Sequence, residues 1–133
     1  MKILTFMVAD LFHVGHLTLL ERMSKMGDVV VGIPCNWPIK EYTKKIDPII
    51  SFEDRLRIVS ACKFVDFAFG YANQEDLEKS IEYIKPDLYV RGDDWRDFPG
   101  HEKIKKMKIP IKFLPYTMGV SSSGIKAKCS IQC

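Results

Sequence analysis

Short apolar runs alternate with amphipathic stretches from the start of the chain. The run ILTF at residues 3–6 predicts a buried strand, and DVVVGI at residues 28–33 predicts another, because continuous β-branched runs are typical of parallel strands buried on both faces. Between them, the stretch GHLTLLERMSKMG predicts a helix closed by Gly27 as its C-terminal cap. The apolar positions of this helix share one face: Leu17, Leu19, Leu20, Met23 and Met26.

The same alternation continues along the rest of the chain. Residues 34–50, with three prolines and three lysines, predict an excursion loop, and Ser51 then caps a helix that has acidic residues in its first turn. We expect strands at 64–70, 87–92 and 111–115, and helices at 52–62, 74–84, 100–108 and 121–128. This order predicts an α/β fold: a Rossmann-like open parallel sheet with helices on both faces, formed by a single domain over residues 1–133.

Composition and charge exclude several classes of protein. The formal net charge is only +3, without a basic stripe that carries interleaved aromatics, so no nucleic-acid partner is expected. No apolar run reaches the roughly 18 residues that span a bilayer, and the N-terminal run is too short for a secretory signal. The four cysteines form no C-x-x-C pair, which argues against a zinc site or a disulfide framework. We therefore expect a cytoplasmic protein without membrane insertion.

Three polar clusters follow predicted strands. They are DLFHVGH at residues 10–16, RGDDWRD at 91–97 and TMGVSSS at 117–123. In open parallel sheets, ligands bind where the carboxyl ends of strands meet the first turns of helices. The clusters are far apart in sequence, yet this fold would bring them together at one edge of the sheet.

The first cluster has the chemistry of an anion site. His13 and His16 are three residues apart at a helix start, where unpaired backbone N–H groups and the positive end of the helix dipole favour an anion, and Gly15 allows close approach. Imidazole N–H groups there could stabilise charge on a leaving group. Two other interpretations stay open from these residues alone: histidines satisfied at the surface or in the core, and a His/His/Asp metal site.

The motifs together resemble the nucleotidylyltransferase superfamily, whose signature is H-x-G-H. DLFHVGH is similar to the cytidylyltransferase branch, RGDDW to the G-D-D-W motif of glycerol-3-phosphate cytidylyltransferases, and YTMGVSSSGIK at 116–126 to their R-T-x-G-I-S-T-T-x-I segment. FEDRLRIV followed by FVD also matches in order and spacing, so the resemblance extends over nearly the whole chain. It implies transfer of CMP from CTP to a phosphorylated small molecule such as glycerol 3-phosphate, with release of pyrophosphate and no covalent enzyme intermediate.

The resemblance also implies roles for individual residues. His13 and His16 would bind the triphosphate and stabilise the transition state, Lys44 and Arg55 would add positive charge, and Ser122 would complete the catalytic set. Asp10 would position Mg²⁺ between phosphate oxygens. The nucleotide would be bound by Val8, Ala9, Asp10, Gly15, Gly92, Asp93, Asp94, Trp95, Tyr116, Gly119, Val120, Ser121 and Ser123. The second and third clusters also have a purely structural interpretation. In it, the second cluster is a capped acidic turn and the third is an ordinary helix N-cap.

Some positions depart from the family pattern. MVAD at residues 7–10 replaces the usual G-T/V/C-F-D run, and Tyr116 replaces the arginine that begins the third motif. The alternatives are therefore an adenylyltransferase of the same fold that uses ATP, with heptose phosphate or FMN as acceptor, and a nucleotide-binding homologue without turnover. The resemblance also implies a homodimer.

Overall fold

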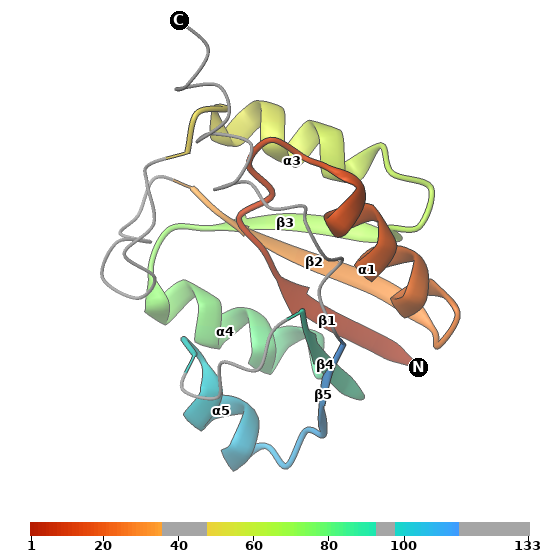
Figure 1. Cartoon of the computed structure of the whole chain (residues 1–133). Coiled ribbons are helices and arrows are strands. Elements are labelled where there is room, and N and C mark those ends of the chain that lie inside the picture. The colour runs from red at the N-terminus through yellow and green to blue at the C-terminus, as the bar shows by residue number, and fades with distance from the viewer. Residues whose placement is uncertain (36–47, 93–97, 115–133) are drawn as a thin grey trace, which may run out of the picture.

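Five strands form one parallel sheet in the computed structural model, which describes residues 1–35, 48–92 and 98–114. The strands are β1 (Lys2–Phe6), β2 (Asp28–Pro34), β3 (Phe67–Tyr71), β4 (Leu88–Arg91) and β5 (Ile111–Phe113), and the helices are α1 (Val14–Ser24), α3 (Phe52–Ser60), α4 (Gln74–Ile84) and α5 (His101–Lys106). The strand order is β3-β2-β1-β4-β5, with α1 and α3 on one face and α4 and α5 on the other (Figure 1). The Rossmann-like fold expected from the sequence is confirmed. The helix expected at 121–128 lies outside the described residues.

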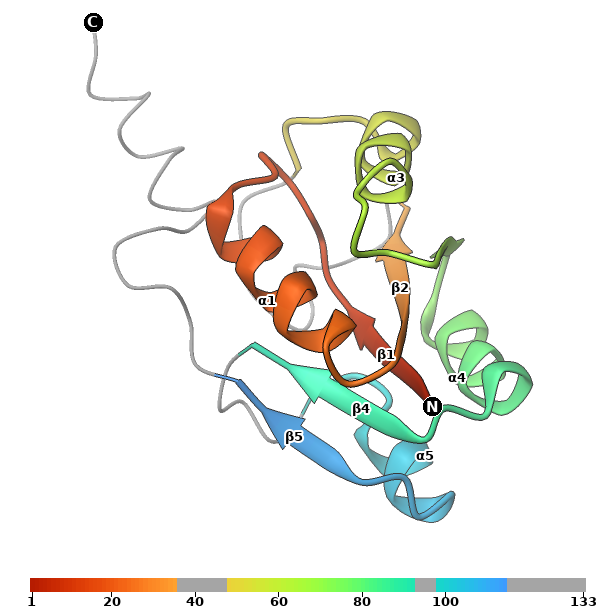
Figure 2. The ribbon, with the colours of Figure 1, turned by 90° about the vertical axis from the view of Figure 1, so that its right-hand side faces the viewer.

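The strand order places a switch point beside β1. From β1 the chain moves to β2 and β3 on one side, and it then crosses to β4 and β5 on the other, as Figure 2 shows. In open α/β sheets, ligands bind in the crevice outside the carboxyl ends of the strands at such a point. The segments that follow β1 and β4 carry the first and second polar clusters. The fold therefore places the starts of these two clusters at neighbouring strand ends.

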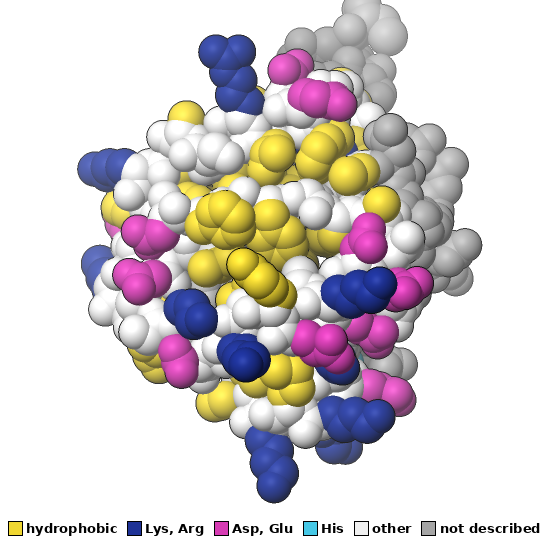
Figure 3. Space-filling view, turned by 180° about the vertical axis from the view of Figure 1, so that it is seen from behind, with side chains coloured by type: hydrophobic (Ala, Val, Ile, Leu, Met, Phe, Trp, Pro, Cys, Tyr) yellow, Lys and Arg dark blue, Asp and Glu magenta, His cyan; other side chains and the backbone are white. Residues whose placement is uncertain are grey.

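The outer edge of β3 is one of the two sheet edges and carries exposed apolar side chains. Phe67 on β3 is 58% exposed, and Ile58 on the neighbouring helix α3 is 41% exposed. Figure 3 shows hydrophobic side chains gathered in the middle of the face that lies behind the view of Figure 1. Among the helices within the described ranges, none has the length and apolar character needed to cross a membrane.

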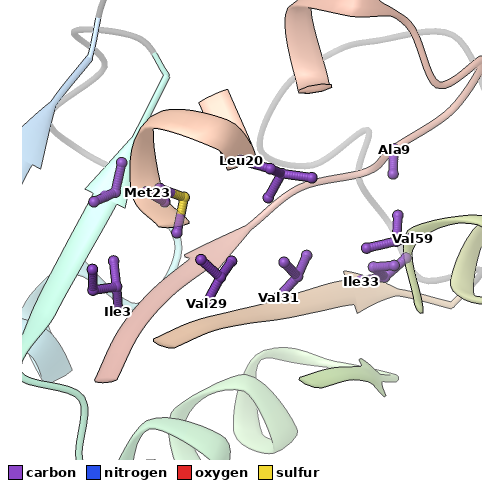
Figure 4. Close-up of a cluster of buried hydrophobic side chains, with 9 residues drawn as sticks. Ile3, Ala9, Leu20, Met23, Val29, Val31, Ile33 and Val59 are labelled. Atoms are coloured by element: carbon purple, nitrogen blue, oxygen red, sulfur yellow. The ribbon is translucent and has the colours of Figure 1, made fainter. Parts of the chain in front are cut away.

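Alternation along the strands divides the core into two layers. Ile3, Val29 and Val31 pack toward α1 and α3, where they meet Leu20 and Met23 of α1 (Figure 4). Their strand neighbours point the other way, and Leu4, Val30 and Tyr89 pack against residues of α4 and α5. The period-two alternation gives β1, β2, β3 and β4 apolar side chains for both layers, which explains the continuous apolar runs in the sequence.

Gly27 is not the helix cap that the sequence predicts. Helix α1 ends at Ser24, with Lys25 as its C-cap in the right-handed region. Gly27 instead lies against the first residue of the chain, where an added Cβ would clash with the Met1 carbonyl oxygen. The residue must be glycine there because of this backbone approach, for which the local sequence gives no signal.

Candidate active site

The turn between β1 and α1 has an unusual backbone. Ala9 and Leu11 have φ values of 56° and 50°, in the left-handed region that side-chain-bearing residues rarely adopt. Between them lies Asp10, which is 2% exposed. Left-handed non-glycine residues cost free energy, persist only where surrounding contacts hold them, and cluster at functional sites. The two left-handed residues therefore cost conformational free energy, and contacts with the rest of the protein must hold the turn in this shape.

Two imidazoles cap the first turn of α1. His13 is the N-cap, and its Nδ1 accepts a hydrogen bond from the Gly15 N–H at 3.0 Å. His16, at the third helical position, accepts from the His13 N–H through its own Nδ1 at 3.1 Å. This is the reciprocal arrangement of a capping box, which serine and glutamate usually form. The sequence predicted that both histidines lie at the helix start, but the mutual capping was not foreseen.

The capping bonds decide which ring nitrogens can donate. Because Nδ1 of each ring accepts a backbone N–H, the proton of each neutral ring lies on Nε2. The two ring centroids are 4.0 Å apart, and the Phe12 ring stacks on His16 with centroids 5.3 Å apart and planes 17° apart. Both histidines are partly exposed rather than sealed in the core. The arrangement places two adjacent imidazoles at the positive end of a helix, a position that favours an anion such as a polyphosphate.

Acidification should weaken the cap. Burial lowers the pKa of the His13 imidazole below its ordinary value, so the unfolded chain takes up a proton at a higher pH than the folded protein does. The contribution of His13 to stability is complete above about pH 6.5 and declines as the pH falls toward the folded-state pKa. We expect the Tm to drop between about pH 7.5 and about pH 5.5, and to drop less in His13→Asn, which caps without titrating. Thermal melts across this range check the prediction, and equal drops in the two proteins would contradict it.

Arg55, to which the family resemblance assigns positive charge for the catalytic set, is a buried residue of α3. Its side chain is 1% exposed, and four hydrogen bonds of 2.9–3.0 Å join it to backbone carbonyl oxygens. The acceptors are Ile50 (from Nε), Val8 and Pro34 (from Nη1) and Cys35 (from Nη2). Burial lowers the pKa of the guanidinium, an effect opposed by the negative charge of Asp10. One signal was available in the sequence: Arg55 and the buried Val59 are four residues apart, on the core-facing side of α3.

The described residues do not fit a magnesium site at Asp10. Its carboxylate accepts the N–H of Ile49 through Oδ2 at 2.9 Å and the N–H of Ile50 through Oδ1 at 3.0 Å. A ligand for Mg²⁺ would have to present an oxygen to a cation that retains several waters, whereas this carboxylate is almost fully buried. Within the described ranges, no group of three or more His, Cys, Asp or Glu side chains is placed to hold a metal.

A second group of polar and aromatic side chains lies at the end of β4, before Gly92. The Arg91 guanidinium lies over the Phe98 ring, 4.5 Å from its centroid, and donates to the Tyr89 hydroxyl at 3.3 Å. Tyr89 stacks on Phe98 with centroids 5.1 Å apart. Arg91 and Phe12 lie in the first two polar clusters of the sequence, but the sequence alone assigns no role to either. An arginine at the last position of a strand that ends in the predicted crevice was a signal that could have found the first of them.

The remaining predicted site residues are placed as follows. Val8 contributes a carbonyl to Arg55, Ala9 is buried in the strained turn, and Gly15 donates to the His13 cap. Outside the described residues lie Lys44, Asp93, Asp94, Trp95, Tyr116, Gly119, Val120, Ser121, Ser122 and Ser123. The structure therefore brings Val8 and Asp10 close to Arg55 and pairs His13 with His16 at the start of α1, whereas the convergence of all three clusters stays a prediction.

Comparison with known proteins adds to this geometry. A family model described as cytidylyltransferase-like matches residues 8–128. The glycerol-3-phosphate cytidylyltransferase of Bacillus subtilis (strain 168) is 33% identical over 126 residues, which cover 94% of each chain. The bifunctional protein HldE of Desulfatibacillum aliphaticivorans is also 33% identical over 126 residues, but the match spans only 26% of that longer protein.

A solved structure shares the same architecture. It is described as the lipopolysaccharide core biosynthesis protein from Thermoplasma volcanium, with a TM-score of 0.69 and 29% identity. The match covers 88% of this chain and 96% of that chain. Pantothenate synthetase from Thermus thermophilus, at 14% identity and a TM-score of 0.51, shares the fold alone; that match covers 86% of this chain and 54% of the synthetase chain.

Proposed function

The chain belongs to the cytidylyltransferase-like family of nucleotidyltransferases, and on this basis we propose that it transfers CMP from CTP to a phosphorylated small molecule. The observation that carries the proposal is the pair of capping imidazoles at the start of α1, whose Nδ1 atoms each accept a backbone N–H, so that the proton of each neutral ring lies on Nε2. Glycerol 3-phosphate or a related phosphate ester is the proposed acceptor. The relative from Bacillus subtilis, which covers nearly the same length, supports this choice.

The proposed reaction is a direct displacement. A phosphate oxygen of the acceptor attacks the α-phosphorus of the triphosphate, and the bond between that phosphorus and the bridging oxygen to the β-phosphorus breaks. The electron pair leaves with pyrophosphate, so negative charge builds up on the leaving group. Nε2–H donors from His13 and His16 would stabilise this charge more strongly in the transition state than in the ground state, which is how such donors accelerate a reaction.

Magnesium enters this proposal as the companion ion of the triphosphate. Mg²⁺ is commonly held by substrate phosphates together with waters, and it would neutralise phosphate charge when bound. The chain's own contribution, among the residues described, is the helix N-terminus and the two imidazoles.

Adenylyl transfer from ATP is the second candidate. The HldE relative and the glycerol-3-phosphate cytidylyltransferase match this chain with the same identity, 33%. A sugar phosphate such as heptose phosphate, or FMN, would then be the acceptor. A third possibility is a protein that binds nucleotide without turnover, and Met7 and Tyr116 are the departures from the family pattern that favour it.

Pyrophosphate release distinguishes these candidates. CTP and ATP are each incubated with Mg²⁺ and one acceptor at a time: glycerol 3-phosphate, phosphocholine, phosphoethanolamine, a sugar 1-phosphate, heptose phosphate or FMN. Release with CTP and a single acceptor supports the first proposal and identifies the product, whereas release with ATP alone supports the second. CTP binding by calorimetry, without release for any acceptor, would favour the non-catalytic alternative.

We further propose that the partner of the chain is a second copy, joined at the β3 edge. An edge strand presents unpaired backbone groups, and two copies related by a twofold axis could pair their β3 strands while covering the exposed Phe67 and Ile58 side chains. We expect Phe67→Glu to shift the protein from dimer to monomer in light scattering. The matched control is Lys112→Glu on β5, at the opposite sheet edge. A monomeric wild-type protein, or a dimer that survives Phe67→Glu, would contradict this assignment.

A further inference from the structure

We propose that Asp10 is a positioning residue: together with Arg55 it clamps the strained turn from which His13 and His16 project. Its consequence for catalysis rests on the proposed transfer reaction, in which these histidines act. This role replaces that of a metal ligand, which the burial and the bonding of Asp10 argue against.

The clamp is a closed ring of contacts around the turn. Asp10 accepts the Ile50 N–H, the Ile50 carbonyl accepts from Arg55 Nε at 3.0 Å, and Arg55 Nη1 donates to the Val8 carbonyl at 2.9 Å. Val8 and Asp10 are only two residues apart, with Ala9 between them. The ring therefore holds the turn on both sides of its first left-handed residue.

A carboxylate is the group that suits this position. Each of its two oxygens accepts one of two consecutive backbone N–H groups, from Ile49 and Ile50, and it stays buried in the field of the Arg55 cation. An asparagine of the same shape can accept at one oxygen only. Its amide nitrogen would face the second backbone N–H, so one donor would lose its partner inside the protein.

A change in the backbone of the turn would be passed to the histidines along a short segment of chain. Only Leu11, also left-handed, and Phe12 separate Asp10 from the His13 cap, and Phe12 stacks on His16. A turn that relaxes out of the left-handed region would move both imidazoles. Misplacement of a catalytic group by about 1 Å can cost about a hundredfold in rate.

The test compares Asp10→Asn with Asp66→Asn. Asp66 accepts the Val29 N–H at 2.8 Å at the other end of the sheet, so its variant makes the same change from carboxylate to amide far from the histidines. Three readouts are measured for each protein: amide hydrogen exchange at Ile49 and Ile50, the imidazole nitrogen resonances of His13 and His16, and kcat, KM and the Mg²⁺ dependence of the transfer reaction.

For Asp10→Asn we expect exchange at Ile49 and Ile50 to accelerate at least about tenfold and the histidine resonances to shift or broaden. We expect kcat to fall about 10- to 100-fold, with a smaller change in KM and an unchanged Mg²⁺ dependence. Asp66→Asn should change none of these quantities, because its side-chain oxygen can still accept the single Val29 N–H.

Two outcomes would overturn the proposal. If the histidine resonances stay unchanged in a folded Asp10→Asn protein, Asp10 does not position the histidines, whether or not the rate falls. If excess Mg²⁺ restores the lost activity, Asp10 is a metal ligand after all. If the wild-type protein performs no transfer, the proposed function fails, while exchange and resonance data still decide whether the clamp exists.

Discussion

Replacing His13 with asparagine should lower kcat by about two to three orders of magnitude while leaving helix α1 intact. Asparagine is among the best N-cap residues, and its side-chain oxygen can accept the Gly15 N–H as His13 Nδ1 does. It is too short to present a donor where His13 Nε2 lies. The variant therefore removes the proposed transition-state contact and keeps the structural one.

A second substitution at the same position separates the two roles of the ring. His13→Ala removes both the donor and the cap, so it should show the same loss of kcat together with a loss of about 1 kcal/mol in the free energy of unfolding. His101→Asn, at the first residue of α5, serves as the control for loss of a histidine elsewhere. Steady-state pyrophosphate release and urea denaturation of the three variants supply the measurements.

The outcome that contradicts this role is equally specific. If His13→Asn keeps more than about a tenth of wild-type kcat while His13→Ala loses stability, His13 is a capping residue and not a catalytic one. Because both variants change the same side chain, differences in expression or folding between distant sites cannot produce this pattern.

The local sequence predicts the elements well where one local rule decides them. β2 is a continuous β-branched run and Ser51 is an N-cap followed by acidic residues, and both elements form where expected. The sequence predicts the position of the histidine cap, because the spacing of His13 and His16 places both rings at a helix start. That each ring accepts a backbone N–H depends on side-chain torsions, which sequence spacing does not specify.

The turn and its clamp could not be predicted for a physical reason. Ala9 and Leu11 have no intrinsic preference for left-handed backbone, so the local sequence contains no signal that predicts their conformation. It is imposed by Asp10 and Arg55, whose partners lie up to 47 positions away along the chain. Contacts of this kind depend on the completed sheet, so the local sequence does not specify them.

Arg55→Lys should cost about 3–5 kcal/mol in the free energy of unfolding, the largest loss of stability that we expect from a single substitution in this protein. Lysine keeps the positive charge but offers three donors at one point, whereas the guanidinium fork reaches carbonyls of three separate segments at Val8, Pro34–Cys35 and Ile50. Buried carbonyl groups would lose their donors, and the Asp10 carboxylate would lose its closely fitted cation.

The same variant decides whether Arg55 acts through its charge or through its shape. If its role were to add positive charge near the triphosphate, Arg55→Lys would retain most of the activity and nearly all of the stability. If the fork matters, stability and activity fall together, and binding of nucleotide recovers only part of the folded population. Arg57→Lys, on the exposed side of the same helix, is the matched control and should change stability by less than about 0.5 kcal/mol. Guanidinium denaturation of both variants gives the free energies, and equal values for the two would remove Arg55 from the clamp.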